Sequence, residues 1–255
     1  MNDRLKKELM GSRLVSFALF ALALIMPVIS VAQSPPPESI IVRTFDRFEI
    51  AGDYYPGQDG MPGVVLSHML NRKRSDWSAF ANTLQAAGYH VLAIDLRGHG
   101  DSKMNGRRTG WRALSKKVFS HAPNDPAAAA AWLREKNGID KNRIALIGAS
   151  IGANASVVAA SRESSNIKTV VLLSCGINYR GVKTDDAIKS YHGPVLIVAA
   201  AGDKYSAESS RKLAQWAGDA TLKIYKGKLH GTNLFRAHED LGPTILKWLK
   251  SKMRN

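Results

Sequence analysis

Apolar positions along the chain follow two patterns that alternate. Short uninterrupted runs such as residues 63–68, "GVVLSH", are typical of strands buried on both faces of a sheet. Segments such as 75–88 instead place apolar residues at helical spacing, between a serine suited to an N-cap and a closing glycine. Because the two patterns alternate from residue 63 onwards, we predict an α/β fold with a mostly parallel, doubly wound sheet of about eight strands and helices on both faces.

The individual elements follow from the same patterns. Residues 39–45 and 48–56 are expected to form two strands joined by a tight turn at Asp46-Arg47. The later strands are expected at 89–96, 143–148, 169–176, 194–202 and 220–227, and the later helices at 125–138, 151–163, 206–218 and 238–253. The two longest irregular segments, 101–122 and 176–194, are the only places where a lid could sit. Neither is long enough for a large one, so little or no lid is expected.

The first 32 residues differ in composition from the rest. Basic side chains precede an apolar run at 14–26, and Ser30 and Ala32 fit the small-residue pattern of a cleavage site. We therefore interpret 1–32 as a secretory signal peptide, followed by a Pro-rich linker over 33–38 and one domain over 39–255. A secreted or periplasmic protein without a transmembrane span after cleavage is expected. The alternative is an uncleaved anchor in the inner membrane, because the apolar segment is nearly long enough to span a bilayer.

The net charge of the chain indicates which partners it could bind, and its cysteine content decides whether an internal disulfide can form. The formal net charge is +15, and removal of four basic and two acidic side chains with residues 1–32 leaves +13. This surplus favours weak association with an anionic envelope surface or acidic substrates. The basic residues are scattered without interleaved aromatic residues, so no specific nucleic-acid site is expected. Cys175 is the single cysteine, which excludes an internal disulfide and is typical of a small core residue.

The stretch "GASIG" holds the strongest candidate for chemistry. A sharp turn from strand to helix needs little bulk on either side, and Gly148 and Gly152 meet this need. Ser150 is then exposed at the sheet rim, next to N–H groups at the start of a helix that can stabilise an oxyanion. The pattern matches the G-x-S-x-G nucleophile elbow.

A serine nucleophile requires a base and a carboxylate that orients the base. Asp203 follows the expected strand at 194–202, and His230 follows the last expected strand. The chain order Ser150, Asp203, His230 is the order that nucleophile-elbow enzymes require. His192 stands before a strand and His238 in the final expected helix, so neither competes well as the base.

The oxyanion hole requires two backbone N–H donors. The best candidates are the N–H of Ile151, directly after the serine, and that of Met69, after the strand at 63–68. His68 is expected to brace this loop. Asp95, His99 and Asp101 stand close together in "DLRGHGDS", but their spacing fits no standard metal site and predicts a glycine-rich turn held by its own polar side chains.

These segments together resemble the α/β-hydrolase superfamily, and in particular its small dienelactone-hydrolase-like and esterase-like bacterial members. The resemblance extends over almost all of residues 40–250 and includes "SHM", "AIDLRGHGDS", "GASIGA", "AAGDKY" and "KLHGTNLF". It implies acyl transfer, most simply on small carboxylic esters, with Ser150 as nucleophile, His230 as base and Asp203 as its partner, and without a metal or organic cofactor. "SHML" departs from the commoner histidine-glycine pair of many esterases.

Two alternatives stay open at this stage. A peptidase or amidase would use the same three side chains on a small acyl substrate. A non-catalytic envelope binding protein could retain the hydrolase scaffold without turnover.

Overall fold

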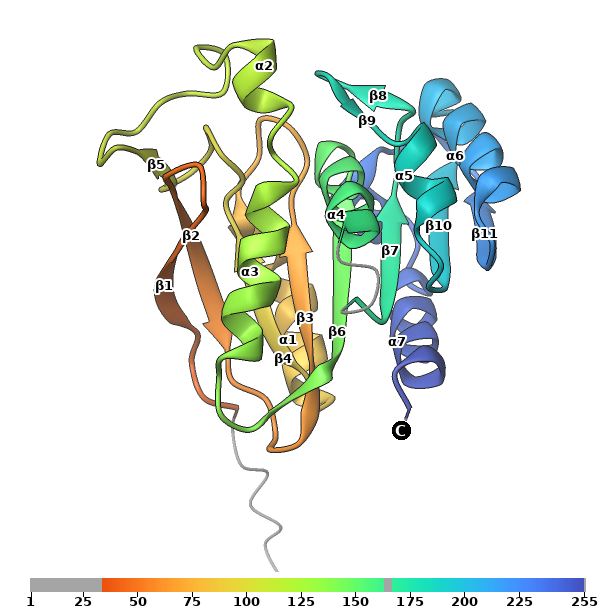
Figure 1. The fold of residues 1–255 in the computed structure, drawn as a ribbon. Coiled ribbons are helices and arrows are strands. Elements are labelled where there is room, and N and C mark those ends of the chain that lie inside the picture. The colour runs from red at the N-terminus through yellow and green to blue at the C-terminus, as the bar shows by residue number, and fades with distance from the viewer. Residues whose placement is uncertain (1–33, 163–166, 255) are drawn as a thin grey trace, which may run out of the picture. The chain divides into compact units, whose positions relative to one another are not determined.

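The computed structural model describes residues 34–162 and 167–254 (Figure 1). The predicted signal peptide, 1–32, lies outside the described residues. Ser34–Asn255 form one compact unit. The strands are β1 (Glu38–Arg43), β2 (Phe48–Tyr55), β3 (Met61–Ser67), β4 (His90–Ile94), β5 (Lys103–Met104), β6 (Ile139–Ala149), β7 (Thr169–Leu173), β8 (Asn178–Tyr179), β9 (Val182–Lys183), β10 (Val195–Ala200) and β11 (Ala220–Tyr225).

The helices alternate with these strands as the apolar pattern predicts. They are η1 (Arg74–Trp77), α1 (Ser78–Ala86), α2 (Lys116–Phe119), α3 (Asn124–Arg134), α4 (Ile151–Arg162), α5 (Asp185–Ser190), α6 (Lys204–Trp216), η2 (Gly231–Arg236) and α7 (Leu241–Lys252). None of the helices in the described part of the chain is long and apolar enough to cross a bilayer.

The main sheet has the strand order β1-β2-β4-β3-β6-β7-β10-β11. From β4 to β11 neighbouring strands are parallel, whereas β1, β2 and β4 pair antiparallel at one edge. Strand β5 adds a short antiparallel pairing to β2, and β8 and β9 form a separate two-stranded ribbon. The predicted mostly parallel, doubly wound sheet is therefore confirmed.

Both faces of the sheet are covered, and successive strand residues supply the two layers of the core. In β3, Val65 packs into the cluster that contains α3, α4 and residues of α5 and α6. Its neighbours Val64 and Leu66 pack into the opposite cluster, which contains α1 and α7. All three side chains are fully buried. This is why the central strands are continuously apolar in sequence.

Two local expectations are wrong. The helix expected at 75–88 begins as the 3₁₀ turn η1, and no side chain caps the start of η1 or of α1, so there is no N-cap serine. The carboxylates that surround Arg74 tie the start of η1 to β2 and to the loop after β4 instead. His238 does not lie in the last helix but precedes it, stacked on the ring of Tyr225.

The carboxyl ends of the parallel strands lie along one rim, shown at the top of Figure 1. The chain leaves β3 toward Met69, β6 toward Ser150, β10 toward Asp203 and β11 toward His230 at this rim. Ligands of open α/β sheets bind at this edge. The topology thus brings together the strand ends that carry the candidate residues.

Candidate active site

Ser150 occupies the sharp turn between β6 and α4. Its backbone φ is +54°, in the left-handed region, and its N–H donates to the carbonyl oxygen of Leu173 at 2.8 Å. A Cβ on Gly148 would lie 2.2 Å from the carbonyl oxygen of Gly152, and a Cβ on Gly152 would lie 2.3 Å from that of Ser67. Both distances are too short for a real contact, so the two glycines are required by close backbone approach. Strained backbone of this kind is concentrated at functional sites.

His230 and Asp203 form a close pair at the same rim. Nδ1 of His230 lies 2.6 Å from Oδ2 of Asp203. Asp203 immediately precedes α6, and His230 precedes η2. The histidine ring is about one-third exposed, whereas the aspartate is mostly buried. The carboxylate therefore fixes the orientation of the ring through Nδ1, whereas Nε2 makes no hydrogen bond to a described residue.

Two further polar side chains surround this pair, and sequence reasoning missed both. Ser206 Oγ lies 3.3 Å from Nδ1 of His230, and Tyr179 Oη lies 3.1 Å from Ser206 Oγ. The rings of Tyr179 and His230 also pack edge to face, with centroids 6.2 Å apart. Burial raises the pKa of Tyr179 to about 12, so its hydroxyl stays protonated near neutral pH. Neither residue belongs to a recognisable motif, because each reaches the site only through the packing of α6 and the β8–β9 ribbon.

Ser174, at the end of β7, holds the loop that carries His230. Its Oγ accepts a hydrogen bond of 2.9 Å from the N–H of Gly231. Gly231 has a φ of +58°, and a Cβ there would meet the sulfur of Met69 at 2.7 Å. A glycine directly after the histidine therefore lets the loop pack against the segment after β3. This is a tertiary requirement that the sequence pattern did not reveal.

A cavity of about 260 Å³ joins the candidate residues. The described residues that line it are Met69, Leu70, Ser150, Ile151, Tyr179, Arg180 and His230. The structure thus brings Ser150 and His230 to one space, with Asp203 bonded behind the histidine. Within the described residues His230 bonds to Asp203 and Ser206, and no hydrogen bond joins it to Ser150. Catalytic hydrogen bonds of this kind often tighten only when substrate binds.

The two expected oxyanion donors also lie at this cavity. Met69 follows β3 and Ile151 is the first residue of α4. Neither backbone N–H donates a hydrogen bond to another residue of the described chain. An N–H at the first turn of a helix has no partner within the helix, and the positive end of the helix dipole adds to its attraction for negative charge.

His68 braces the loop that contains Met69. Its Nε2 accepts from the N–H of Leu96 at 3.0 Å, so Nδ1 carries the proton and donates to the carbonyl oxygen of Met69 at 2.8 Å. The ring is fully buried, and this burial, together with the nearby His99, lowers the pKa of His68 to about 4. His68 is therefore a neutral structural residue that positions the loop containing Met69.

The cluster of Asp95, His99 and Asp101 holds its own loop, as expected. Asp95 accepts hydrogen bonds from the backbone N–H groups of Arg74 and Asp101, at 2.7 and 2.9 Å. His99 Nδ1 lies 3.0 Å from the carbonyl oxygen of Arg97. In the described ranges no group of three or more His, Cys, Asp and Glu side chains is arranged to hold a metal ion.

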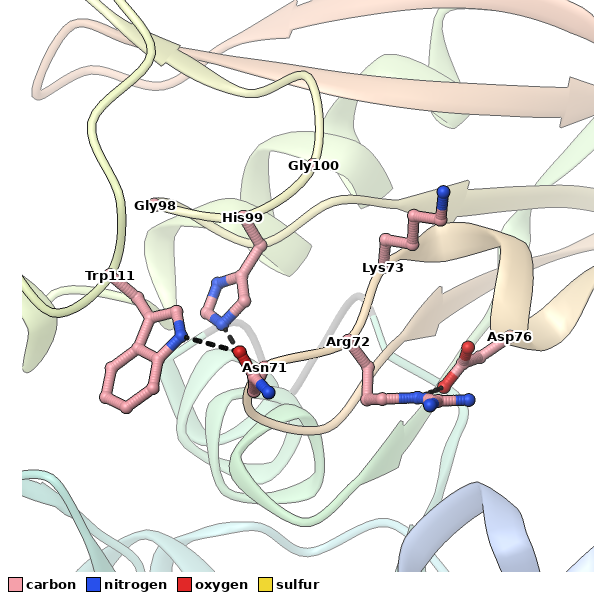
Figure 2. A pocket seen from close by; sticks show the side chains of 8 residues that line it. All are labelled: Asn71, Arg72, Lys73, Asp76, Gly98, His99, Gly100 and Trp111. Atoms are coloured by element: carbon pink, nitrogen blue, oxygen red, sulfur yellow. Dashed lines mark hydrogen bonds and ion pairs between the residues drawn. The ribbon is translucent and has the colours of Figure 1, made fainter.

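A second, larger cavity of about 420 Å³ is lined by residues of this loop and of the segment after Leu70. Figure 2 shows Asn71 between two rings: its N–H donates to Nε2 of His99 at 3.1 Å, and the indole N–H of Trp111 lies 3.4 Å from its side-chain oxygen. Arg72 pairs with Asp76 at 2.6 Å on the opposite wall. The cavity is therefore polar and partly basic.

Arg97, in the loop after β4, connects three parts of the chain. It is fully buried, pairs with Asp125 at 2.7 Å and with Asp46 at 2.7 Å, and its guanidinium lies over the ring of Phe48. The β1–β2 turn and the start of α3 are thereby tied to the β4 loop. Cys175 is also buried, as expected, and its Sγ lies 3.1 Å from Oδ1 of Asn154.

The doubly wound sheet, the serine elbow after β6 and the residues at the strand ends define an α/β hydrolase. Three solved structures with this fold support the assignment. The α/β hydrolase GrgF from Penicillium sp. sh18 superposes with a TM-score of 0.73 at 17% identity, over 86% of this chain and 99% of that one. Dienelactone hydrolase from Anabaena variabilis gives 0.71 at 17% identity, over 87% and 100%. Esterase Pf2001 from Pyrococcus furiosus gives 0.70 at 19% identity, over 86% and 93%.

Sequence comparison identifies the family of α/β hydrolases to which the chain belongs. The model of the serine aminopeptidase S33 family matches residues 62–190, and the chain belongs to this family of hydrolases. Two curated relatives, uncharacterized proteins from the CDC 1551 and H37Rv strains of Mycobacterium tuberculosis, are each 27% identical over 187 residues. These alignments include 66% of this chain, and the chain spans 63% of the relatives' length.

Proposed function

We propose that this protein is a serine hydrolase that acts by acyl transfer on small carboxylic esters. Ser150 attacks the substrate carbonyl, His230 takes the hydroxyl proton and later returns it to the leaving alcohol, and Asp203 stabilises the charged imidazole. The backbone N–H groups of Met69 and Ile151 receive the oxyanion. Water then attacks the acyl-enzyme with His230 again as base, releasing the carboxylic acid and regenerating Ser150.

One observation carries this proposal. The cavity that contains the strained Ser150 also contains His230, and the other side of that histidine is bonded to Asp203 at 2.6 Å. Ser150, His230 and Asp203 come from three strand ends and lie together there, next to two unpaired N–H groups, which supports their roles as nucleophile, base and orienting carboxylate. The small volume of the cavity favours a short acyl group. Loss of one oxyanion donor typically costs about 3–4 kcal/mol of transition-state stabilisation.

The test compares two serine-to-alanine variants, one directly before α4 and one near its end. Ser150→Ala is expected to lose hydrolysis of p-nitrophenyl acetate and labelling by a fluorophosphonate probe. Ser161→Ala, near the end of α4, removes only a hydroxyl that bonds the carbonyl oxygen of Val158, so it should retain both. Circular dichroism checks that each variant is folded. Equal labelling of Ser150→Ala and the parent protein would reject the proposal, and no labelling of the parent would favour a non-catalytic binding protein.

An aminopeptidase is the second candidate, because it is the description of the matching family. Such an enzyme must bind the cationic amino terminus of a peptide. The described residues that line the cavity include no aspartate or glutamate, whereas Arg180 contributes a positive charge. This arrangement repels an ammonium group and favours ester hydrolysis over aminopeptidase activity. Aminoacyl p-nitroanilides compared with p-nitrophenyl acetate would separate the two activities.

We also propose that residues 1–32 direct the protein to the cell envelope, where its basic surface meets anionic material. Fractionation of cells that express the full chain, with mass spectrometry of the mature N-terminus, tests this. A terminus after Ala32 supports cleavage, whereas an intact segment in the membrane fraction supports the anchor.

A further inference from the structure

Arg180 lies at the tip of the β8–β9 ribbon and lines the cavity that holds Ser150 and His230. Its φ is +49° and that of Gly181 is +89°, as in the tight turns that join short antiparallel strands. The first of these positions normally favours glycine or asparagine. The fold nevertheless places a long cationic side chain there and directs it to the cavity.

The guanidinium is held by aromatic rings rather than by carboxylates. It lies 4.9 Å from the ring centroid of Trp111 and 5.0 Å from that of Phe119. Nε of Arg180 is buried and donates no hydrogen bond to any described residue. Arg97, whose whole side chain is buried, instead has two carboxylate partners. A guanidinium oriented by stacking retains its hydrogen-bond donors for a ligand.

The surroundings of Arg180 favour a negative ligand. It is the one permanently charged side chain among the described residues that line the smaller cavity. Trp111, which packs against it, also lines the larger cavity, where Arg72 is paired with Asp76 and Lys73 adds a further positive charge. The charge of Arg180 also acts on the larger cavity, because burial and this charge both lower the pKa of His99, which lines it. Arg180 therefore stands between the reactive serine and a second, partly basic space.

We propose that Arg180 is a specificity-determining residue that pairs with a carboxylate of the substrate, so that the enzyme prefers anionic esters to neutral esters of the same size. The proposal rests on the proposed ester hydrolysis at Ser150. A planar guanidinium binds a carboxylate through two parallel N–H···O bonds, which a stacked and pre-oriented side chain forms at low entropic cost.

The test uses two pairs of esters that differ in charge. Monomethyl succinate and methyl pentanoate place the difference on the acyl side, and acetoxyacetate and propyl acetate place it on the alcohol side. Hydrolysis is followed by proton NMR at low ionic strength for the parent, Arg180→Met and Arg211→Met. Arg211 is exposed on α6 and does not line the cavity, so its replacement controls for the loss of one positive charge.

The parent protein is expected to have the higher kcat/KM for the anionic member of at least one pair. Arg180→Met should lower that value by about 10- to 100-fold, as expected for loss of hydrogen bonds to a charged group, and leave the neutral member within about twofold. Arg211→Met should change neither. The pair that responds locates the carboxylate on the acyl or the alcohol side.

The proposal is overturned if the parent shows no preference in either pair, or if Arg180→Met lowers the anionic and neutral rates equally. Failure of the underlying function has a different signature, because the parent would then hydrolyse none of the four esters and would not be labelled by a fluorophosphonate.

Discussion

Nδ1 of His230 lies 2.6 Å from Oδ2 of Asp203, although the two residues are 27 positions apart in the chain. Each follows a different strand, β11 and β10, and these strands pair in parallel. Their carboxyl ends therefore lie side by side, and the loops that leave them meet. The contact between Asp203 and His230 is therefore a direct consequence of the parallel pairing of β10 and β11.

Asp203→Asn should lower kcat for p-nitrophenyl acetate by roughly 10³- to 10⁴-fold, because an amide supports the wrong imidazole tautomer and does not stabilise the imidazolium. Steady-state kinetics measures this. Asp219→Asn is the control, since that aspartate pairs with Lys252 away from the cavity. An Asp203→Asn variant with the parent kcat would remove Asp203 from the mechanism.

Gly152→Ala should destabilise the fold and lower activity. Alanine in a helix is usually favoured over glycine by about 1 kcal/mol, but here the added Cβ would lie 2.3 Å from the carbonyl oxygen of Ser67. The overlap dominates, and we expect a net loss of about 1–3 kcal/mol in urea unfolding. Gly218→Ala is the control, because a Cβ there meets nothing within 4 Å. Equal stability of the two variants would contradict the close approach.

Stability should fall as the pH is lowered from about 6.5 to 4, in part because of His68. The pKa of this buried residue is about 4 in the folded protein, against an ordinary value of 6.5. In this window the unfolded chain binds a proton that the folded chain does not, so acid favours unfolding, by up to about 3 kcal/mol. His68→Gln retains an acceptor for Leu96 and should show a shallower dependence in urea unfolding from pH 4 to 7. An unchanged slope would contradict the assignment.

Arg97→Met should cost about 3–5 kcal/mol in the free energy of unfolding, because Asp125 is left buried without its partner. Burial already raises the pKa of Asp125, so the orphaned carboxyl is expected to protonate. The double variant Arg97→Met/Asp125→Asn should recover part of the loss. Chemical denaturation of both variants measures this. If the single variant is as stable as the parent, Arg97 does not anchor the fold.

Much of the architecture could be predicted from local patterns. The continuous apolar runs of β3, β6, β7 and β10 follow from burial on both faces, and the G-x-S-x-G turn follows from the space that a tight strand-to-helix turn requires. Ser150 and Asp203 could be selected because each follows such a run. His230 could be selected only because it follows the last expected strand, β11, which is partly exposed, and parallel strands end at one rim. The roles assigned to these residues stay predictions for the assays above.

The chain by itself determined which residues follow each strand and in what order, because periodicity and glycine placement are local properties. Only the tertiary structure decided which side chains from unrelated segments surround the cavity. Arg180 reaches the space beside Ser150 because Trp111, from a loop, and Phe119, from α2, hold its guanidinium. Ser206 and Tyr179 approach His230 through the packing of α6 against the β8–β9 ribbon. Contacts of this kind depend on the sum of long-range packing, which no short stretch of sequence contains.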